Sequence, residues 1–469
     1  MNRSMSATRH LPSTLALCAW LGACDPPDTA PDASTPTDAS RTDDAARSDA
    51  AGPTQWSFEI LETRTVTALE TTREAHLVRA SRPDGARSYF LYLPVARASA
   101  PMVVFTEPYA GIDWTGEDVD ARWAARGAGT HPDDEAPGYD GDDVIAYEPQ
   151  SPQQATDASI VWLANQVAVV HAYGRFYAGG SIEDDALDAA APFFFARTRS
   201  EIDRAHLGAW GGSWGAFMAM FGAARAPGDA APIAVGALWG PSDYTDLWAY
   251  TDTLPSVFPA PDRAEAFFST YRRRIVASTG GPPPRETFTP FDRDALCEGL
   301  GSDTHVLSLH DDWDTLVPVT QTRSLVEACA AQVSPLYWHR QRDVDYAEVS
   351  LDHGVSFRDE PEVPTAYTFS HAFVLARLIP SGPIYVIASE PALTAYLQTV
   401  HAEQRAGGDA SDAWPMLRTL AEERVSAFTP AGVFEPAADL LARAASTVYG
   451  RAYTAASLRA ELEVSLPAP

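Results

Sequence analysis

The sequence predicts an α/β fold built on a mostly parallel sheet, and three observations support this prediction. Strand-like and helix-like segments alternate from about residue 88 to the helical run at 367–373. A glycine-framed turn at 211–215 joins an apolar strand to an apolar helix. Polar loops follow two later apolar strands. Ligands bind beyond the carboxyl ends of such strands, so the functional residues are expected there.

The first 24 residues have the pattern of an export signal. Arg3 and Arg9 precede a short apolar stretch, 11–23, which falls far below the ~20 residues of a membrane span. Leu21–Cys24 resembles a bacterial lipobox, in which Cys24 is acylated; an ordinary signal peptide is the alternative. The pattern indicates a lipid-anchored protein of the cell envelope, periplasmic or at the surface, or a secreted protein.

Residues 25–55 form an acidic tether with seven Asp, two Arg and five Pro. Such a segment has too little apolar surface to fold and is predicted to be disordered. The whole chain carries a formal charge of −29. This charge disfavours nucleic acid and anionic lipid surfaces as partners, and leaves a small-molecule or peptide substrate, with the membrane reached only through the lipid anchor.

The predicted catalytic body spans 56–378. Three β-like stretches, Trp56–Thr63, His76–Ala80 and Ser88–Leu93, are expected as hairpin strands at a sheet edge. The segment 243–295 is rich in aromatic residues and is predicted to be a cap that shields the site; helices packed by aromatics are the alternative. Residues 379–469 are expected to form a helical C-terminal extension.

The candidate nucleophile is Ser213, in the G-x-S-x-G pattern of residues 211–215. His206–Trp210 is predicted to be a buried strand, and Ala216–Phe221 a buried helix. A strand-to-helix turn of this kind holds the serine in strained backbone geometry with its hydroxyl facing a cleft. The pattern also occurs by chance in a chain rich in Ala and Gly, and the flanking elements favour the functional interpretation.

A serine hydroxyl needs a base, and the base needs a carboxylate that orients it. The strand Thr304–Leu309 is followed by an acidic loop, in which Asp314 is our candidate acid. Asp311 and Asp312 are close rivals, and a solvated loop carboxylate is the plain alternative.

The candidate base is His353, which lies between a predicted strand at 335–339 and the helical run at 367–373. The chain order Ser, Asp, His is the one expected for an elbow of this type. His310, His339 and His371 remain lower-ranked candidates.

Three motifs, at 211–215, His310–Pro318 and Asp352–Gly354, together resemble the α/β-hydrolase superfamily over roughly 85–378. Asp311 replaces the glycine that usually follows the histidine of the second motif. Within the superfamily, the sequence is similar to the prolyl oligopeptidase and cocaine esterase/X-Pro dipeptidyl peptidase branches. The resemblance implies a mostly parallel sheet with helices on both faces, and a serine hydrolase that forms an acyl-enzyme without a cofactor. A peptide substrate is favoured; a carboxylic ester, or an inert hydrolase-fold binding lipoprotein, is the alternative.

An acyl-transfer site also needs two donors for the oxyanion. One candidate is the backbone N–H of Trp214, the residue after the nucleophile. Pro108 has no N–H, so the second donor is expected from Tyr109, or from the N–H of Ala110. The resemblance to the cocaine esterase group implies the Tyr109 hydroxyl, whereas a packed aromatic side chain is the alternative.

Two cysteines, Cys297 and Cys329, flank the strand and loop that carry Asp314. In an oxidising compartment they could form one disulfide, and two buried thiols are the alternative. No Cys/His cluster has zinc-like spacing, so no metal is expected.

Overall fold

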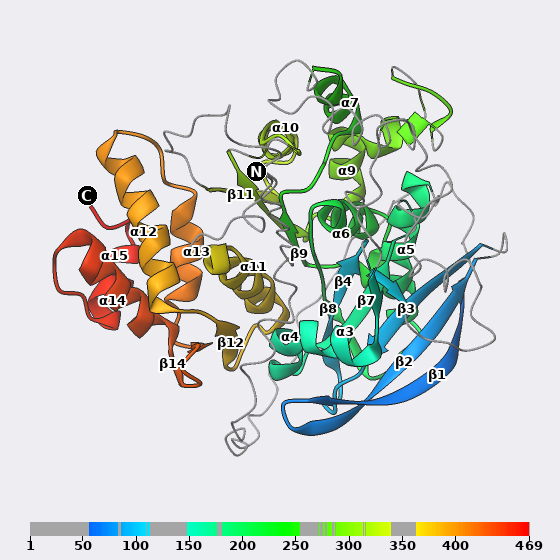
Figure 1. The fold of residues 1–469 in the computed structure, drawn as a ribbon, viewed down its shortest axis with the longest axis horizontal. Helices are drawn as coiled ribbons and strands as arrows, with labels where there is room; N and C mark the ends of the chain where they lie inside the picture. The colour runs from blue at the N-terminus through cyan, green and yellow to red at the C-terminus, as the bar shows by residue number, and fades with distance from the viewer. Residues whose placement is uncertain are drawn as a thin grey trace, which may run out of the picture.

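The computed structural model describes residues 56–82, 86–108, 110–112, 148–174, 176, 181–253, 272, 275–276, 279–283, 286, 288–312, 314, 316–338 and 363–468. At its centre lies a nine-stranded sheet (Figure 1). From one edge to the other the strands are β1 (Ser57–Ala68), β2 (Thr71–Ser81), β3 (Arg87–Leu93), β7 (Ala168–Tyr173), β4 (Ala100–Glu107), β8 (Ile202–Gly212), β9 (Ala234–Leu238), β10 (His305–Asp311) and β11 (Val333–Trp338).

The sheet is mostly parallel, as predicted. The β1–β2, β2–β3 and β3–β7 pairs are antiparallel, and all pairs from β7 to β11 are parallel. The parallel strands therefore end together at one edge, and β4, β8, β9 and β10 are consecutive neighbours there. This arrangement places the residues that follow these four strands close to one another.

Helices cover both faces of the sheet and divide the core in two. One face packs against α5 (Ile182–Ala196), α6 (Trp214–Ala224), α9 (Arg293–Gly299) and α10 (Thr320–Ala328). The other packs against α4 (Ile160–Ala164) and α11 (Val363–Leu378). A mostly parallel sheet between two helical layers, with a strand–serine–helix turn at its edge, is the α/β-hydrolase fold. The predicted fold class is confirmed.

The sheet begins with the predicted edge hairpin, in which β1 pairs antiparallel with β2, with one register shift between Ile60 and Glu62. Its turn residues, Leu69 and Glu70, both have positive φ angles, 50° and 59°. Two-residue turns with this backbone match the right-handed twist of the flanking strands. The hairpin extends the sheet on the side away from the strands that carry the candidate site.

Smaller elements connect the main ones. They are β5 (Ala110–Ile112) paired with β6 (Glu148–Gln150), α3 (Pro152–Ala158), the short helix η4 (Gly228–Ala230), α7 (Tyr244–Thr253) and η6 (Thr289–Phe291). Tyr244, at the start of the predicted cap, is fully buried, and its ring packs against the rings of Trp214 and Phe217. Tyr244 therefore packs into the core; residues 254–271 of the predicted cap lie outside the described residues, and the cap stays a prediction.

The C-terminal extension is less purely helical than expected. It contains α12 (Glu390–Arg405), α13 (Ala413–Leu420), α14 (Ala437–Tyr449) and α15 (Ala455–Leu462), but also a small sheet of β12 (Ile384–Ile387), β13 (Val425–Phe428) and β14 (Phe434–Pro436). These strands have three or four residues each, too few for a clear alternation of apolar and polar positions. In Figure 1 the extension lies beside α11, away from the β1–β2 hairpin.

Candidate active site

Ser213 occupies a strained turn between β8 and α6. Its backbone angles are φ 54° and ψ −125°, in the positive-φ region that residues other than glycine rarely adopt. Its N–H donates to the carbonyl oxygen of Leu238 in β9, at 2.8 Å. The neighbouring strand therefore holds the serine at the carboxyl edge of the sheet. Strain of about 1–3 kcal/mol at one residue is typical of functional sites.

The turn can form only because its glycines allow close packing. A Cβ on Gly211 would lie 2.1 Å from the hydroxyl oxygen of Thr106, and one on Gly215 would lie 3.0 Å from that oxygen. The buried Thr106 hydroxyl donates to the carbonyl oxygen of Gly215, at 2.7 Å. This hydrogen bond joins the end of β4 to the first turn of α6.

Trp214 follows Ser213 and begins α6. Its side chain is buried, its ring stacks on Phe176 with centroids 4.1 Å apart, and its indole N–H donates to Asp185 at 2.7 Å. The backbone N–H groups at a helix start favour negative charge. The backbone N–H of Trp214 is thus suited to be an oxyanion donor. The Trp214 side chain contacts Phe176, Asp185 and Tyr244.

Asp314 is buried just beyond the carboxyl end of β10. One carboxylate oxygen, Oδ1, accepts from the N–H groups of Leu316 and Val317, at 3.0 and 2.8 Å. The other, Oδ2, lies 3.8 Å from Nε2 of His310. The loop backbone therefore fixes the orientation of this carboxylate, as an orienting acid requires.

The rival carboxylates have different environments. Asp312 pairs with Arg323 of α10, at 2.9 Å, and this ion pair gives it a structural role. Asp311 is the last residue of β10 and is fully buried. Alternation along the strand places Asp311 on the opposite face from His310.

Two of the alternative histidines are held in the fold by hydrogen bonds or by ring contacts. His310 is buried; its Nε2 donates to the carbonyl oxygen of Val317 at 2.8 Å, and its Nδ1 lies 2.9 Å from the Thr322 hydroxyl. His371 packs against the rings of Trp162 and Trp210, and burial lowers its pKa to about 3. His371 is therefore a weak base, and both nitrogens of His310 are occupied.

Four further predicted site residues, His353, His339, Tyr109 and Cys24, lie outside the described residues. The roles assigned to them stay predictions. The described part of the site consists of Ser213, with the residues around it, and the acidic loop after β10.

Glu107, the last residue of β4, lies directly before the predicted oxyanion segment and was not singled out from the sequence. The Glu107 carboxyl is 20% exposed and lies 3.8 Å from Nδ1 of His171. Burial raises the pKa of Glu107 to about 8, an effect opposed by a hydrogen bond to Gln150. Gln150 also accepts from the Tyr173 hydroxyl, at 2.9 Å. An acidic residue at the end of an otherwise apolar strand was the available signal.

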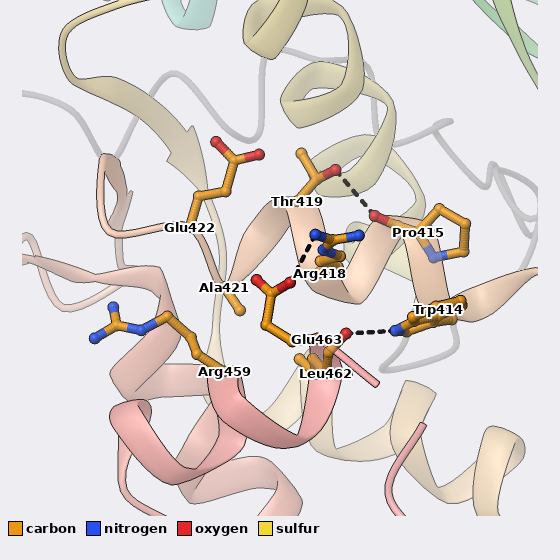
Figure 2. Close-up of a pocket in the computed structure, with 9 residues that line it drawn as sticks. All are labelled: Trp414, Pro415, Arg418, Thr419, Ala421, Glu422, Arg459, Leu462 and Glu463. Atoms are coloured by element: carbon orange, nitrogen blue, oxygen red, sulfur yellow. Dashed lines mark hydrogen bonds and ion pairs between the residues drawn. The ribbon is translucent and has the colours of Figure 1, made fainter. Parts of the chain in front are cut away.

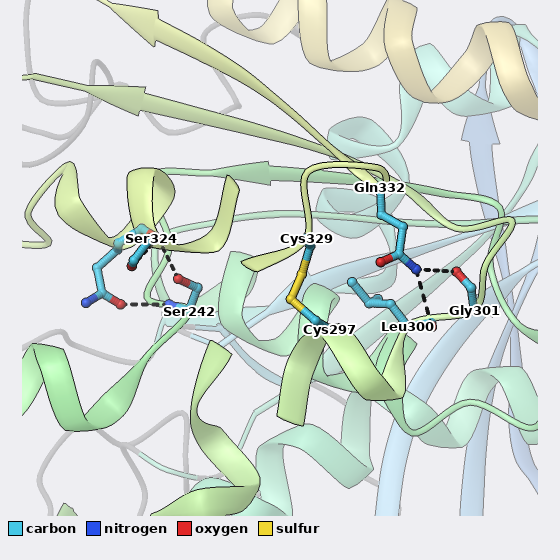
Figure 3. The surroundings of a disulfide bond; sticks show 8 residues. Ser242, Cys297, Leu300, Gly301, Ser324, Cys329 and Gln332 are labelled. Atoms are coloured by element: carbon cyan, nitrogen blue, oxygen red, sulfur yellow. Dashed lines mark hydrogen bonds between the residues drawn. A yellow bond between two sulfur atoms is a disulfide. The ribbon is translucent and has the colours of Figure 1, made fainter. Parts of the chain in front are cut away.

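A disulfide joins Cys297 of α9 to Cys329 at the end of α10, with Cα atoms 5.6 Å apart (Figure 3). Nearby, the buried side chain of Gln321 in α10 accepts from the N–H groups of Ser242 and Asp243. These links fasten α10, which follows the acidic loop, to the segment after β9 and to α9.

A cavity of about 410 Å³ lies in the C-terminal extension, between α13 and α15 (Figure 2). Its charged side chains are engaged with one another or with neighbours: Arg418 pairs with Glu463, and Arg459 with Glu423. None of its lining residues comes from the edge of the main sheet that holds Ser213. The cavity is separate from the candidate active site.

Among the described residues, no helix is long and apolar enough to cross a membrane. No group of three or more His, Cys, Asp or Glu side chains in the described ranges is arranged to hold a metal ion.

No family model and no curated protein matches the sequence. Similar solved structures include the acylaminoacyl peptidase of Pyrococcus horikoshii, with a TM-score of 0.39 and 12% identity over 67% of this chain and 41% of that one. A puromycin-hydrolyzing peptidase of Mycobacterium tuberculosis has a TM-score of 0.40 and 15% identity, over 65% and 39%. Acetyl xylan esterase 1 of a Thermoanaerobacterium species has a TM-score of 0.34 and 13% identity, over 61% and 80%.

The aligned region spans less than half of either peptidase. At these levels of similarity, the assignment of the fold rests on the strand order, the two helical layers and the elbow described above.

Proposed function

We propose that the protein is a serine hydrolase in which Ser213, His353 and Asp314 act as nucleophile, base and orienting acid. The observation that carries the proposal is the backbone of Ser213, at φ 54° and ψ −125° between a parallel strand and a buried helix. A buried carboxylate beyond the next strand but one supports it. A strained serine in a glycine-framed turn between a strand and a helix is typical of a catalytic nucleophile.

The proposed reaction has two halves. His353 takes the proton of Ser213 as its oxygen attacks the substrate carbonyl, and Asp314 stabilises the imidazolium that forms. The backbone N–H of Trp214 and the side chain of Tyr109 hold the oxyanion. His353 then protonates the leaving group, and water, activated in the same way, releases the acid from the acyl-enzyme.

An amide bond in a peptide is the proposed target, with a carboxylic ester as the alternative. The sequence resemblance described above supports this order. Hydrolysis of aminoacyl-arylamides and of short acyl esters would be compared under the same conditions. Rapid ester cleavage without any arylamide cleavage would reverse the order.

The proposed location is the cell envelope or the outside of the cell, with a lipid anchor at Cys24. The Cys297–Cys329 disulfide supports this location, because disulfides persist mainly in oxidising compartments. Metabolic labelling with a fatty-acid analogue, in the full-length protein and in a Cys24→Ala variant, would test the anchor. Equal labelling of both would reject it.

A fluorophosphonate probe tests the catalytic proposal directly. The purified protein should be labelled covalently, and labelling should disappear in Ser213→Ala but persist in Ser324→Ala, a control in α10. Loss of the nucleophile or base in a triad costs roughly 10⁶ in rate. If the folded wild-type protein is not labelled, the chain is better described as a binding lipoprotein with a hydrolase fold.

A further inference from the structure

The buried carboxylate of Asp185, in the first turn of α5, accepts hydrogen bonds from Trp214, the neighbour of Ser213, and from Phe176, which follows β7. Oδ2 accepts from the indole N–H of Trp214 at 2.7 Å, and Oδ1 accepts from the backbone N–H of Phe176 at 2.9 Å. The first residue follows the nucleophile, and the second belongs to the loop after β7. One side chain thus connects the elbow to a neighbouring loop at the same edge of the sheet.

The chain is adapted to this carboxylate at several positions. A Cβ on Gly174 would lie 2.8 Å from Oδ2 of Asp185, so the backbone there passes too close for a larger residue. Ser181 and Asp184 form a capping box that starts α5 and fixes its first turn. Burying a carboxylate is costly unless it is hydrogen-bonded, and Asp185 has no exposed surface. The cost of burying the Asp185 carboxylate indicates that its hydrogen bonds have a role.

The contact to Trp214 holds a side chain next to a peptide plane that the proposed reaction uses, and the carbonyl oxygen of that plane accepts from the N–H groups of Ala216 and Phe217. The plane between Ser213 and Trp214 carries the N–H that would bind the oxyanion, and its orientation depends on the strained ψ of Ser213. The Trp214 ring is held by Asp185 and by its stack on Phe176, with ring planes 17° apart. A ring fixed in this way limits rotation of its own backbone. An oxyanion donor is effective only when it is oriented in advance.

We infer that Asp185 is a positioning residue, which orients the Trp214 peptide N–H and the backbone of Phe176 for transition-state binding. It touches neither the substrate nor the reacting atoms. This inference rests on the proposed serine-hydrolase function.

The same helix provides a matched control. Asp188 lies one turn later on α5 and is equally buried, but it accepts from the hydroxyl of Ser88 on β3, away from the elbow. Asp185→Asn and Asp188→Asn therefore remove one buried charge each, from the same helix, at different distances from the site. Loss of helix stability affects both variants, whereas loss of orientation affects only Asp185→Asn.

The experiment measures kcat and KM with an acyl ester, and the rate constant for fluorophosphonate labelling of Ser213. We expect Asp185→Asn to lower kcat and the labelling rate at least tenfold, with KM changing less than threefold. Asp188→Asn should keep both rates within about twofold. A purely structural role predicts equal losses in the two variants, or losses that follow the folded fraction seen by circular dichroism.

Trp214→Phe keeps an aromatic ring that can stack on Phe176, but removes the indole donor together with part of the buried ring; it is the second variant if Asp185→Asn fails to fold. It should lower kcat in the same direction. Where both variants fold, the double variant should be no slower than the slower single one, because both changes break the same bond. Wild-type rates in Asp185→Asn, additive losses in the double variant, or a wild-type rate in Trp214→Phe would overturn the inference. An unlabelled wild-type protein would instead reject the catalytic proposal on which it rests.

Discussion

At the scale of single residues, Glu107 shows how a polar group at the sheet edge couples stability to pH. Burial raises the pKa of Glu107 from 4.5 to about 8, while His171, buried beside it, has its pKa lowered to about 3. Tyr173 has its pKa raised well above 10. Both neighbours are therefore uncharged at pH 7, and the protonated form of Glu107 is the one that this site favours.

We predict that Glu107→Gln becomes progressively more stable than the wild type as pH rises from about 4.5 to about 8. In that window the unfolded chain ionises Glu107 while the folded protein keeps it protonated, so the wild type loses stability until ionisation of the folded form ends the trend. The difference should reach a few kcal/mol, at about 1.4 kcal/mol per pKa unit. Urea unfolding at pH 5, 7 and 9 measures it, with Glu74→Gln as an exposed control. An equal difference at pH 5 and pH 9 contradicts the prediction.

The elbow also makes a prediction at single positions. In Gly211→Ala the new Cβ would lie 2.1 Å from the Thr106 hydroxyl oxygen and 2.5 Å from the Gly215 carbonyl oxygen. We expect a loss of about 1–3 kcal/mol in unfolding free energy, together with slower labelling of Ser213. Gly212→Ala is the control, because its Cβ would meet only ordinary contacts from 3.5 Å outward. Equal stability of the two variants would show that the elbow relaxes freely.

At the scale of elements, the disulfide links α9 to α10, the helix that follows the acidic loop. Cys297 and Cys329 are separated by 32 residues. Closing a loop of this length should contribute about 3–4 kcal/mol through the unfolded state. We predict that the Cys297→Ala/Cys329→Ala variant unfolds at correspondingly lower urea concentration, and that reduced wild type behaves like it. An unchanged midpoint under reducing conditions would mean that the bridge does not constrain the unfolded chain.

At the scale of the whole molecule, the C-terminal extension completes the core of the main sheet. The ring of Tyr396 in α12 packs against Trp338 of β11 at 4.5 Å and against Phe369 of α11 at 4.9 Å. Asp412, before α13, accepts from the backbone N–H of Tyr337 on the edge strand β11, at 2.7 Å. The extension therefore covers both an apolar surface and part of a sheet edge.

We predict that a chain ending at residue 380 is largely insoluble, because it exposes this apolar surface and an unpaired edge strand. The soluble fraction and the size-exclusion profile, compared with the full-length chain, measure the effect. A truncated protein that is monomeric and still labelled by the fluorophosphonate would show that the body folds independently.

Much of the architecture could be predicted from local patterns. Helices α12 to α15 lie in the segment for which a helical extension was expected. The short strands β12 to β14 were missed, because three or four residues carry no periodicity. Asp185 was also missed as part of the site. Its only local signal is a carboxylate on the apolar stripe of α5, and its partners Phe176 and Trp214 lie 9 and 29 residues away.

The alternation of strands and helices could be predicted from the amino-acid order, because it depends on contacts within a few residues, and the serine turn could be recognised from its G-x-S-x-G pattern. The environment of that turn was decided by tertiary structure. Asp185 reaches Trp214 only because α5 packs beside α6, and Asp314 shares a sheet edge with Ser213 only because β10 lies two strands from β8 in the same parallel sheet. Contacts between distant segments depend on how the layers pack, and no local pattern records them.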